Sequence, residues 1–271
     1  MSKAGRRRRL RELLDQVFER YGGVEHLDSD PLSRVVTYPD AGDQEVVGFI
    51  AAALSFGNVK AILGGIDAAL GPLGPNPNER LKSWAPEEAL KAVTGFQYRW
   101  IHDQDLGGLY VAIGETLRRE GSLEALFGQD KREPGSGVAA GASALIHGLR
   151  SRLPDAIRGR RGARFLLADP DGAGASKRLH MYLRWMIRRE APDLGLWSSV
   201  SPDQLLMPLD THVARISRYI GLTARTKVDR RTVTEVTESL RSIYPDDPTK
   251  YDFALARLGI LGQCPHRRDV K

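Results

Sequence analysis

Residues 206–216 read Leu-Met-Pro-Leu-Asp-Thr-His-Val-Ala-Arg-Ile, an apolar segment that passes through one proline into an amphipathic helix. Pro208 cannot continue a helix and holds the residue before it extended, so the helix is expected to begin after this point. Asp210 then stands where a side chain caps a helix start, with Val213 and Ile216 on the buried face behind it. Backbone N–H groups and the helix dipole keep a carboxylate at this place near its ionised form. Chemistry that develops positive charge can use such a group.

Helical periodicity extends over most of the remaining chain. Apolar residues recur at helical spacing and predict helices over residues 10–21, 43–54, 60–70, 86–93, 106–120, 141–152, 178–190, 213–220, 232–243 and 250–258. The alternating pattern of strands is essentially missing. Residues 129–137, Gln-Asp-Lys-Arg-Glu-Pro-Gly-Ser-Gly, are typical of a surface loop. The fold is therefore expected to be all-α.

The composition is that of a globular protein with an excess of basic residues. The 271 residues, 41% of them hydrophobic, suffice for one large domain or two small ones. Lys and Arg total 40 against 34 acids, and the net charge of +6 favours an anionic partner. Basic residues gather in three clusters: Arg6 to Arg9; Arg158, Arg160, Arg161 and Arg164; and Lys177, Arg178, Arg184, Arg188 and Arg189. Three clusters with few acids among them indicate a nucleic acid as that partner.

Cysteine and histidine usage gives no sign of a metal centre. The one cysteine, Cys264, can form neither an intrachain disulfide nor a four-cysteine metal or iron–sulfur site. Zinc-ligand spacing is missing among His102, His147, His180, His212 and His266. We therefore expect no metal and no cofactor. No apolar stretch reaches transmembrane length and the N-terminal residues begin a basic helix, so a cytoplasmic protein without membrane contact is expected.

A second informative segment is the helix that follows Ser176. One face carries an apolar stripe, and Lys177, His180 and Arg184 recur at steps of three and four on another face. The preceding residues 166–176 read Leu-Leu-Ala-Asp-Pro-Asp-Gly-Ala-Gly-Ala-Ser. The proline ends the earlier helix, Ser176 or the second Asp can cap the next one, and the two glycines permit backbone conformations that a Cβ forbids. A helix–Gly-x-Gly–helix turn of this kind can hold a phosphate, although a plain helix connection is the more common explanation.

The octapeptide at 208–215, Pro-Leu-Asp-Thr-His-Val-x-Arg, resembles the aspartate motif of the helix-hairpin-helix DNA glycosylases, the superfamily of endonuclease III and the 8-oxoguanine glycosylases. The wider chain, from about residue 43 to 264, resembles an uncharacterised family at the edge of that superfamily. The resemblance implies a fold of two helical lobes with a central cleft. A six-helix bundle with the hairpin would cover residues 43–197, and residues 1–42 with 198–271 would form the second lobe. Endonuclease III carries an iron–sulfur cluster that a single cysteine cannot build.

The resemblance further implies that Lys177 and Asp210 are a catalytic pair. The lysine amine of a bifunctional glycosylase attacks the sugar of a flipped nucleotide and forms a Schiff base, while the carboxylate stabilises the cationic sugar. The amine must be neutral to attack, and Arg178, His180 and Arg184 are candidate cationic neighbours that would favour this. The superfamily reads Gly-x-Gly-x-Lys, but this chain has one further residue before the lysine. If that residue displaces Lys177, the remaining candidates are Lys60 and Lys250.

Other segments resemble the DNA contacts and the base pocket of the superfamily. Within residues 49–60, Phe56 would wedge between bases and Asn58 would pair with the widowed base, unless the segment is an ordinary helix corner. The remaining residues expected to contact DNA are Lys60, Gly172, Gly174, Ser176, Arg178, His180, Arg184 and His212. The residues expected at the base pocket are Tyr98, Asp252 and Phe253.

The expected function is base-excision repair of double-stranded DNA by a monomeric glycosylase with AP (β) lyase activity, located in the cytoplasm at the nucleoid. One alternative is a nucleic-acid-binding protein that retains the fold without the reaction. Another is an interaction protein whose basic face meets an acidic partner. No motif in the sequence specifies the lesion.

Overall fold

The computed structural model describes residues 2–130 and 137–261 of the chain. These residues are predominantly helical, and the strands among them form one two-stranded sheet, so the all-α class is confirmed. Most of the expected surface loop, residues 131–136, lies outside the described residues, as does Cys264. No helix of the described part is both long and apolar enough to cross a membrane.

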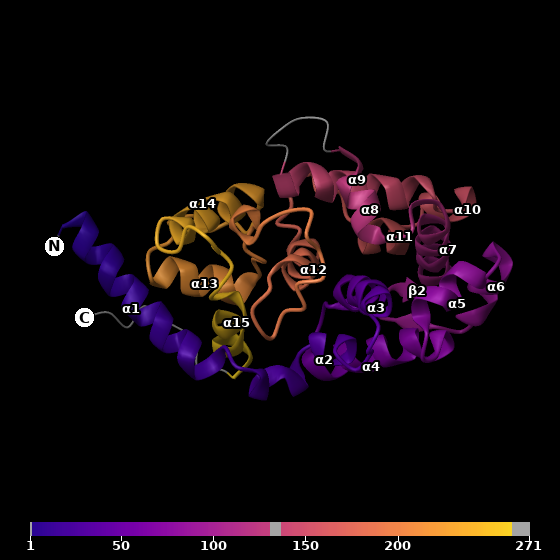
Figure 1. Ribbon diagram of the computed structural model, residues 1–271, viewed down its shortest axis with the longest axis horizontal. Helices are drawn as coiled ribbons and strands as arrows, with labels where there is room; N and C mark the ends of the chain where they lie inside the picture. The colour runs from indigo at the N-terminus through magenta and orange to yellow at the C-terminus, as the bar shows by residue number, and fades with distance from the viewer. Residues whose placement is uncertain (1, 131–136, 262–271) are drawn as a thin grey trace. The chain divides into compact units, whose positions relative to one another are not determined.

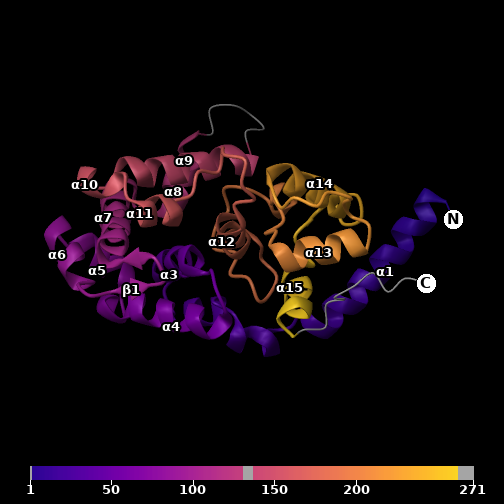
Figure 2. The ribbon, with the colours of Figure 1, turned by 180° about the vertical axis from the view of Figure 1, so that it is seen from behind.

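The chain contacts define two compact units, residues 29–171 and residues 1–28 with 172–271. Figure 1 and Figure 2 show the course of the chain through both. The bounds differ from those expected, because the helix that begins at Lys177 belongs to the unit that contains both chain ends. Arg184 of this helix and Arg188 directly after it form ion pairs with acids at positions 193–252 of that same unit. The turn over residues 167–176 therefore crosses from one unit into the other.

The unit of residues 29–171 is helical, and its longest helix, α7, packs against six of the others. Its elements are α2 (Leu32–Val35), α3 (Ala41–Leu54), α4 (Val59–Leu70), η2 (Gly71–Leu73), α5 (Pro77–Ser83), α6 (Pro86–Ala92), β1 (Gln97–Tyr98), β2 (Ile101–His102), α7 (Asp103–Glu120), α8 (Leu123–Phe127), η3 (Gly128–Asp130), α9 (Gly137–Ser151), α10 (Asp155–Arg158) and α11 (Arg161–Leu166). Helix α7 contacts α5, α6, α8, α9, α10 and α11. The buried Glu45 of α3 accepts the N–H groups of Leu123 and Glu124, at 2.9 and 2.8 Å, and so caps α8 from within the core.

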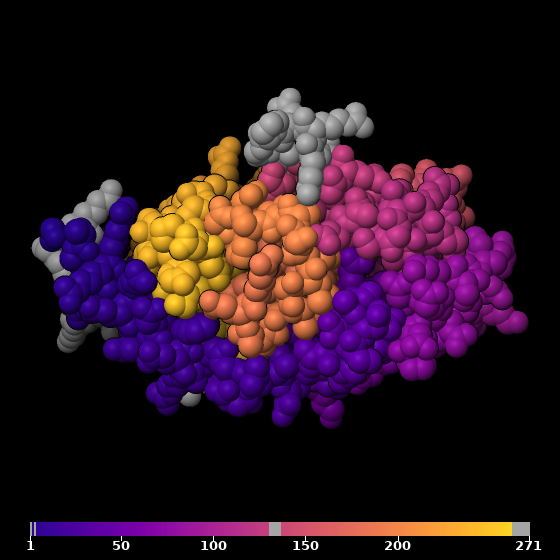
Figure 3. All heavy atoms as spheres, in the orientation of Figure 1, coloured from indigo at the N-terminus to yellow at the C-terminus, as the bar shows by residue number. Residues whose placement is uncertain are grey.

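The second unit combines the N-terminal helix with the last third of the chain. Its elements are α1 (Lys3–Tyr21), η1 (Val24–Ser29, which ends at the unit boundary), α12 (Lys177–Ile187), η4 (Pro202–Gln204), α13 (Thr211–Tyr219), α14 (Arg230–Arg241) and α15 (Asp252–Ile260). Helix α1 packs against α15, and Figure 3 shows the indigo atoms of α1 beside yellow atoms from the last third of the chain. Leu14 of α1 shares one apolar core with Val213, Val236 and Leu255. This core includes the start of α13 through Val213, and Ala175, just before α12, packs against it.

Candidate active site

Lys177 and Asp210, which were expected to act together, lie in direct contact. Lys177 is the first residue of α12 and Asp210 is the N-cap of α13. The Nζ atom of the lysine lies 3.1 Å from Oδ2 of the aspartate. The two side chains are 35% and 25% exposed, so solvent or a ligand can reach the pair. The additional residue in the turn has therefore not separated them.

The two carboxylate oxygens of Asp210 have different partners. Oδ1 accepts the backbone N–H groups of His212 and Val213 at 2.9 and 2.8 Å, which satisfies donors at the start of α13. Oδ2 is the atom that faces Lys177. The preceding segment is anchored because Met207 and Leu209 are buried, and the N–H of Met207 donates to Oγ1 of Thr237 at 3.0 Å. The expected capping role of Asp210 is thus observed, and it leaves one oxygen for chemistry.

The surroundings of Asp210 favour its ionised form. Burial acts to raise the pKa of this carboxyl, but the charge of Lys177, the N–H of Val213 and the charge of His212 together hold the pKa below its ordinary value. A carboxyl group with a pKa below its ordinary value is ionised throughout the neutral pH range. Asp210 is therefore an anion beside a primary amine.

In the turn before Lys177, the residue with a left-handed backbone conformation is a serine and not one of the two glycines. Ser176 adopts a left-handed conformation, with φ of 46°, and makes no side-chain cap bond to α12. Gly172 and Gly174 are not among the described residues with positive φ, and a Cβ on Gly174 would meet no atom within 4 Å. The expectation that these glycines serve a conformation closed to other residues was wrong. The turn is instead fixed by a bond from the N–H of Arg230 to the carbonyl of Ala173, at 3.0 Å.

Arg184 was expected on a DNA-binding face, but it is buried in an ion-pair network. Its Nε and Nη2 bond Asp193 at 3.1 and 3.0 Å, and its Nη1 bonds Asp252. Arg188, one helical turn later, bonds Asp193 and Asp247 at 3.2 and 2.7 Å. A buried charge is stable only when it is paired. Since both guanidiniums are buried with such partners, they are not placed to contact a phosphate.

His180, also expected to contact DNA and to serve as a cationic neighbour, is 8% exposed. Burial, and secondarily the charge of Arg230, lowers its pKa to about 4, so the imidazole is neutral at physiological pH. Its Nδ1 is buried and has no hydrogen-bond partner among the described residues. His180 is therefore a core residue. Of the three residues expected as cationic neighbours of Lys177, Arg178 is the one that is only half-buried. Burial lowers the pKa of Arg178 to about 10, which leaves it charged at neutral pH.

Asp252 and Phe253, expected at a base pocket, begin helix α15 and are buried. The ring of Phe253 lies under the guanidinium of Arg257, 4.6 Å from its centroid. Burial raises the pKa of Asp252 to about 6. The positive charges of Arg184 and Lys177 oppose this rise, and the negative charges of Asp210 and Asp193 add to it. This carboxyl therefore lies within electrostatic range of the Lys177–Asp210 pair, although its hydrogen-bonding side is turned to Arg184.

The remaining expected site residues of the terminal unit are accessible. Ser176 and Arg178 are half-buried, and Gly172, Gly174 and His212 are exposed. The Nδ1 atom of His212 lies 3.2 Å from the guanidinium of Arg215. Lys250, the alternative nucleophile, lies 3.5 Å from a carboxylate oxygen of Asp15 and 4.3 Å from the centroid of an aromatic ring. These contacts give Lys250 a packing role.

The other expected residues lie in the unit of residues 29–171. Phe56 is half-buried among Tyr98, Trp100 and Phe165, with ring centroids 4.9, 4.9 and 4.7 Å away. Tyr98, expected at the base pocket, is buried and donates its hydroxyl to the carbonyl of Phe56. Since both rings are packed, the structure favours the ordinary helix corner that was the alternative to a wedge for Phe56, and it makes Tyr98 a core residue.

Asn58 and Lys60 follow this corner at the start of α4. Asn58 is the N-cap of the helix and accepts the N–H of Ala61 at 2.9 Å, and the Lys60 side chain is exposed. The Asn58 side chain thus already has a structural partner.

The comparison of the chain with known proteins yields one result. The model of a family described as a protein of unknown function, DUF2400, matches residues 30–261. The chain belongs to this family. Neither a curated protein nor a solved structure matches the chain. The matched range contains both Lys177 and Asp210 and excludes α1.

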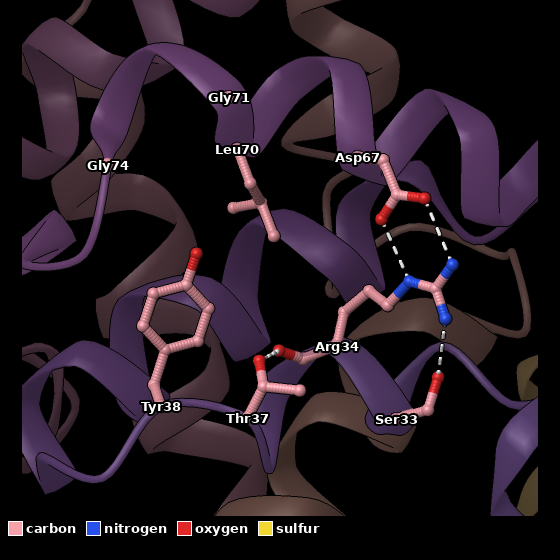
Figure 4. Close-up of a pocket in the computed structure, with 8 residues that line it drawn as sticks. All are labelled: Ser33, Arg34, Thr37, Tyr38, Asp67, Leu70, Gly71 and Gly74. Carbon is pink, nitrogen blue, oxygen red and sulfur yellow. Dashed lines mark hydrogen bonds and ion pairs between the residues drawn. The ribbon is translucent and has the colours of Figure 1, made fainter.

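The sequence did not indicate a pocket in the unit of residues 29–171 of this DUF2400 protein. Its volume is about 490 Å³, and its lining residues are Ser33, Arg34, Thr37, Tyr38, Asp67, Leu70, Gly71 and Gly74. Figure 4 shows the guanidinium of Arg34 turned to Asp67, with bonds of 2.8 and 2.9 Å. The principal charges of the pocket are thus paired with each other.

Proposed function

We propose that this DUF2400 protein is a DNA glycosylase with AP lyase activity, which removes a damaged base from double-stranded DNA through a lysine Schiff base. The observation that carries the proposal is the 3.1 Å contact between Nζ of Lys177 and Oδ2 of Asp210. The sequence around both residues resembles the corresponding motifs of the helix-hairpin-helix glycosylases. A primary amine and an ionised carboxylate at two helix starts are the groups that this reaction needs.

In the first step of the proposed reaction, Oδ2 of Asp210 accepts a proton from Nζ of Lys177. The freed electron pair of Nζ attacks C1′ of the nucleotide. The bond between C1′ and the base breaks, and its electron pair leaves with the base, which takes a proton from water. Before this proton transfer is complete, the carboxylate charge of Asp210 stabilises the positive charge that develops on the sugar as the bond between C1′ and the base weakens.

In the second step the sugar ring opens. The nitrogen of Lys177 forms a double bond to C1′ as it loses its remaining transferable proton, and the ring oxygen leaves C1′ and takes a proton. Removal of a proton from C2′ then expels the 3′ phosphate, which cuts the strand. The imine formed in this step is what borohydride reduces to a stable amine.

The test uses a duplex with a single abasic site, because lyase activity on that site does not depend on the identity of the lesion. The full-length protein is incubated with this duplex and with an undamaged duplex in the presence of borohydride. A covalent adduct with the abasic duplex alone is the expected result. Binding without an adduct would instead indicate a nucleic-acid-binding protein without the reaction. Failure to bind either duplex would favour the interaction protein.

Duplexes that carry one damaged base each, oxidised purine, oxidised pyrimidine or uracil, then identify the substrate. Base release from one of them, measured by alkaline cleavage of the strand, is expected. An adduct with the abasic duplex and no base release from any member would leave a lyase without glycosylase activity.

A further inference from the structure

Away from the Lys177–Asp210 pair, three potential metal ligands meet in the unit of residues 29–171. They are His147 on α9 and Asp169 and Asp171 in the segment that follows α11. One ligand atom from each lies within 4.8 Å of the others, and all three side chains are exposed. We propose that these three residues form a binding site for a divalent cation of the Zn²⁺ or Mn²⁺ type.

The spacing of the three ligand atoms fits a shared ion, and two of them also form a long hydrogen bond in the absence of an ion. Nε2 of His147 lies 3.3 Å from Oδ1 of Asp169 and 3.7 Å from Oδ2 of Asp171. A charge-assisted bond between such groups is typically about 2.7–2.9 Å long. Two ligands bound at about 2.1 Å in tetrahedral geometry are about 3.4 Å apart. The observed spacing is therefore open enough for an ion, which would replace the long hydrogen bond between His147 and Asp169.

Neighbouring groups orient the two carboxylates toward the histidine. The hydroxyl of Ser143 donates to the other oxygen of Asp171 at 2.9 Å, and Nη1 of Arg150 bonds the other oxygen of Asp169 at 3.3 Å. The N–H of Asp171 donates to Oδ1 of Asp169 at 3.0 Å, the same oxygen that faces His147. Such outer contacts commonly fix metal ligands.

The charge of the cluster also suits a divalent cation. Two carboxylates beside one guanidinium, that of Arg150, leave one negative charge when His147 is neutral. An added divalent cation therefore meets a net attraction.

The donor set indicates the class of cation. One imidazole nitrogen with two carboxylate oxygens suits Zn²⁺ and Mn²⁺, whereas Mg²⁺ and Ca²⁺ prefer oxygen ligands alone. Three protein ligands at an exposed position leave room for water on the ion. Bound there, the cation would join α9 to the segment that follows α11. This inference does not rest on the proposed function, because none of the three residues belongs to the Lys177–Asp210 pair.

Calorimetric titration with Zn²⁺, repeated with Mn²⁺, tests the site on full-length protein that has been dialysed against a chelator. His147→Gln and Asp171→Asn each remove one ligand and keep a polar side chain of similar shape. His102→Gln is the control, because His102 is an exposed histidine of the same unit outside the cluster. We expect one Zn²⁺ per chain, at least tenfold weaker binding in both ligand variants, and unchanged binding in the control.

Thermal denaturation of the same four proteins with Zn²⁺ and with chelator provides a second readout. A metal that binds the native state raises the melting temperature, and both ligand variants should lose this rise. Absence of Zn²⁺ binding to the wild type, or equal affinity in the wild type and both ligand variants, would overturn the site.

Discussion

Replacement of Asp210 by Asn separates the two roles that its carboxylate oxygens have. The amide oxygen of Asn can still accept the N–H groups of His212 and Val213, and Asn caps helices about as well as Asp. The ion pair with Lys177 is lost, but both partners are partly exposed, and such a pair contributes only about 0–1 kcal/mol to stability. The melting temperature should therefore fall by less than about 5 °C.

The chemical loss should be much larger than the loss of stability. A neutral amide can neither accept the proton of Lys177 nor stabilise a cationic sugar, and one such electrostatic contact is typically worth about 3 kcal/mol in a site. Single-turnover base release should drop at least about a hundredfold, which corresponds to about 2.7 kcal/mol. The measurement combines thermal denaturation, duplex binding and base release on the duplex identified as substrate.

Asp229→Asn is a matched control for this experiment. Asp229 caps α14 through the N–H of Thr232 at 3.0 Å and pairs with Arg225 at 2.9 Å. Its replacement removes a cap-bound charge of the same kind elsewhere in the same unit. We expect a similar small change in melting temperature and wild-type base release. If Asp210→Asn unfolds the protein, or releases base as fast as the wild type, Asp210 is only a cap and the mechanism is refuted.

The charge of Asp210 should also affect the free energy of unfolding at acidic pH. Because the folded-state pKa of Asp210 is lowered, its charge adds stability above its unfolded pKa of about 3.9. That contribution is lost as the pH falls through the lower folded-state value. The difference in unfolding free energy between wild type and Asp210→Asn should therefore shrink as a urea titration series is carried from pH 7 toward pH 3.

Three further predictions concern the nucleophile, the basic surface and a buried acid. Lys177→Ala should abolish the borohydride adduct with abasic DNA and retain duplex binding. The control Lys60→Ala, at an exposed lysine, should form the adduct normally. An adduct with Lys177→Ala would mean that another residue is the nucleophile. Duplex affinity should fall about a hundredfold for a fourfold rise in salt if about four phosphates are neutralised, and a flat salt response would reject DNA as the partner. Because the pKa of Asp252 is raised to about 6, its ionisation should make unfolding easier as the pH rises from about 4 to 6. Asp252→Asn should remove this fall in the free energy of unfolding, measured by equilibrium denaturation across the same pH range. An unchanged pH profile in the variant would contradict the prediction.

Local sequence signals predicted the long helices and the pair of groups at the site. The cap at Asp210 follows from a proline and an apolar stripe within eleven residues, and the structure has the same cap. The buried stripe of α12 was equally readable, since Leu179, Tyr182 and Met186 are all buried. Helices such as α10 and α11 were missed because they are too short to show periodicity.

Pairings between distant positions had no such signal. Arginines at helical spacing on α12 resemble a solvated face, and only the fold shows that Arg184 meets Asp252, 68 residues later. His147 and Asp169 are likewise 22 residues apart, on different elements, so no ligand spacing marked them. The prediction for the turn before Lys177 was wrong for a different reason. Glycine normally supplies a left-handed conformation, but here Ser176 adopts it.

The pairing of α1 with α15 also sets an order of events during synthesis on the ribosome. Phe18 contacts the ring of Tyr251 at 6.3 Å between centroids, and the hydroxyl of Tyr251 donates to Asp15 at 2.8 Å. At about 5–20 residues per second, the nascent N-terminal helix waits roughly 10–50 seconds for this partner to emerge. The unit of residues 29–171 can complete its core in that interval, because its sequence is continuous. The half that carries Lys177 and Asp210 is thus assembled last, after translation has passed α15.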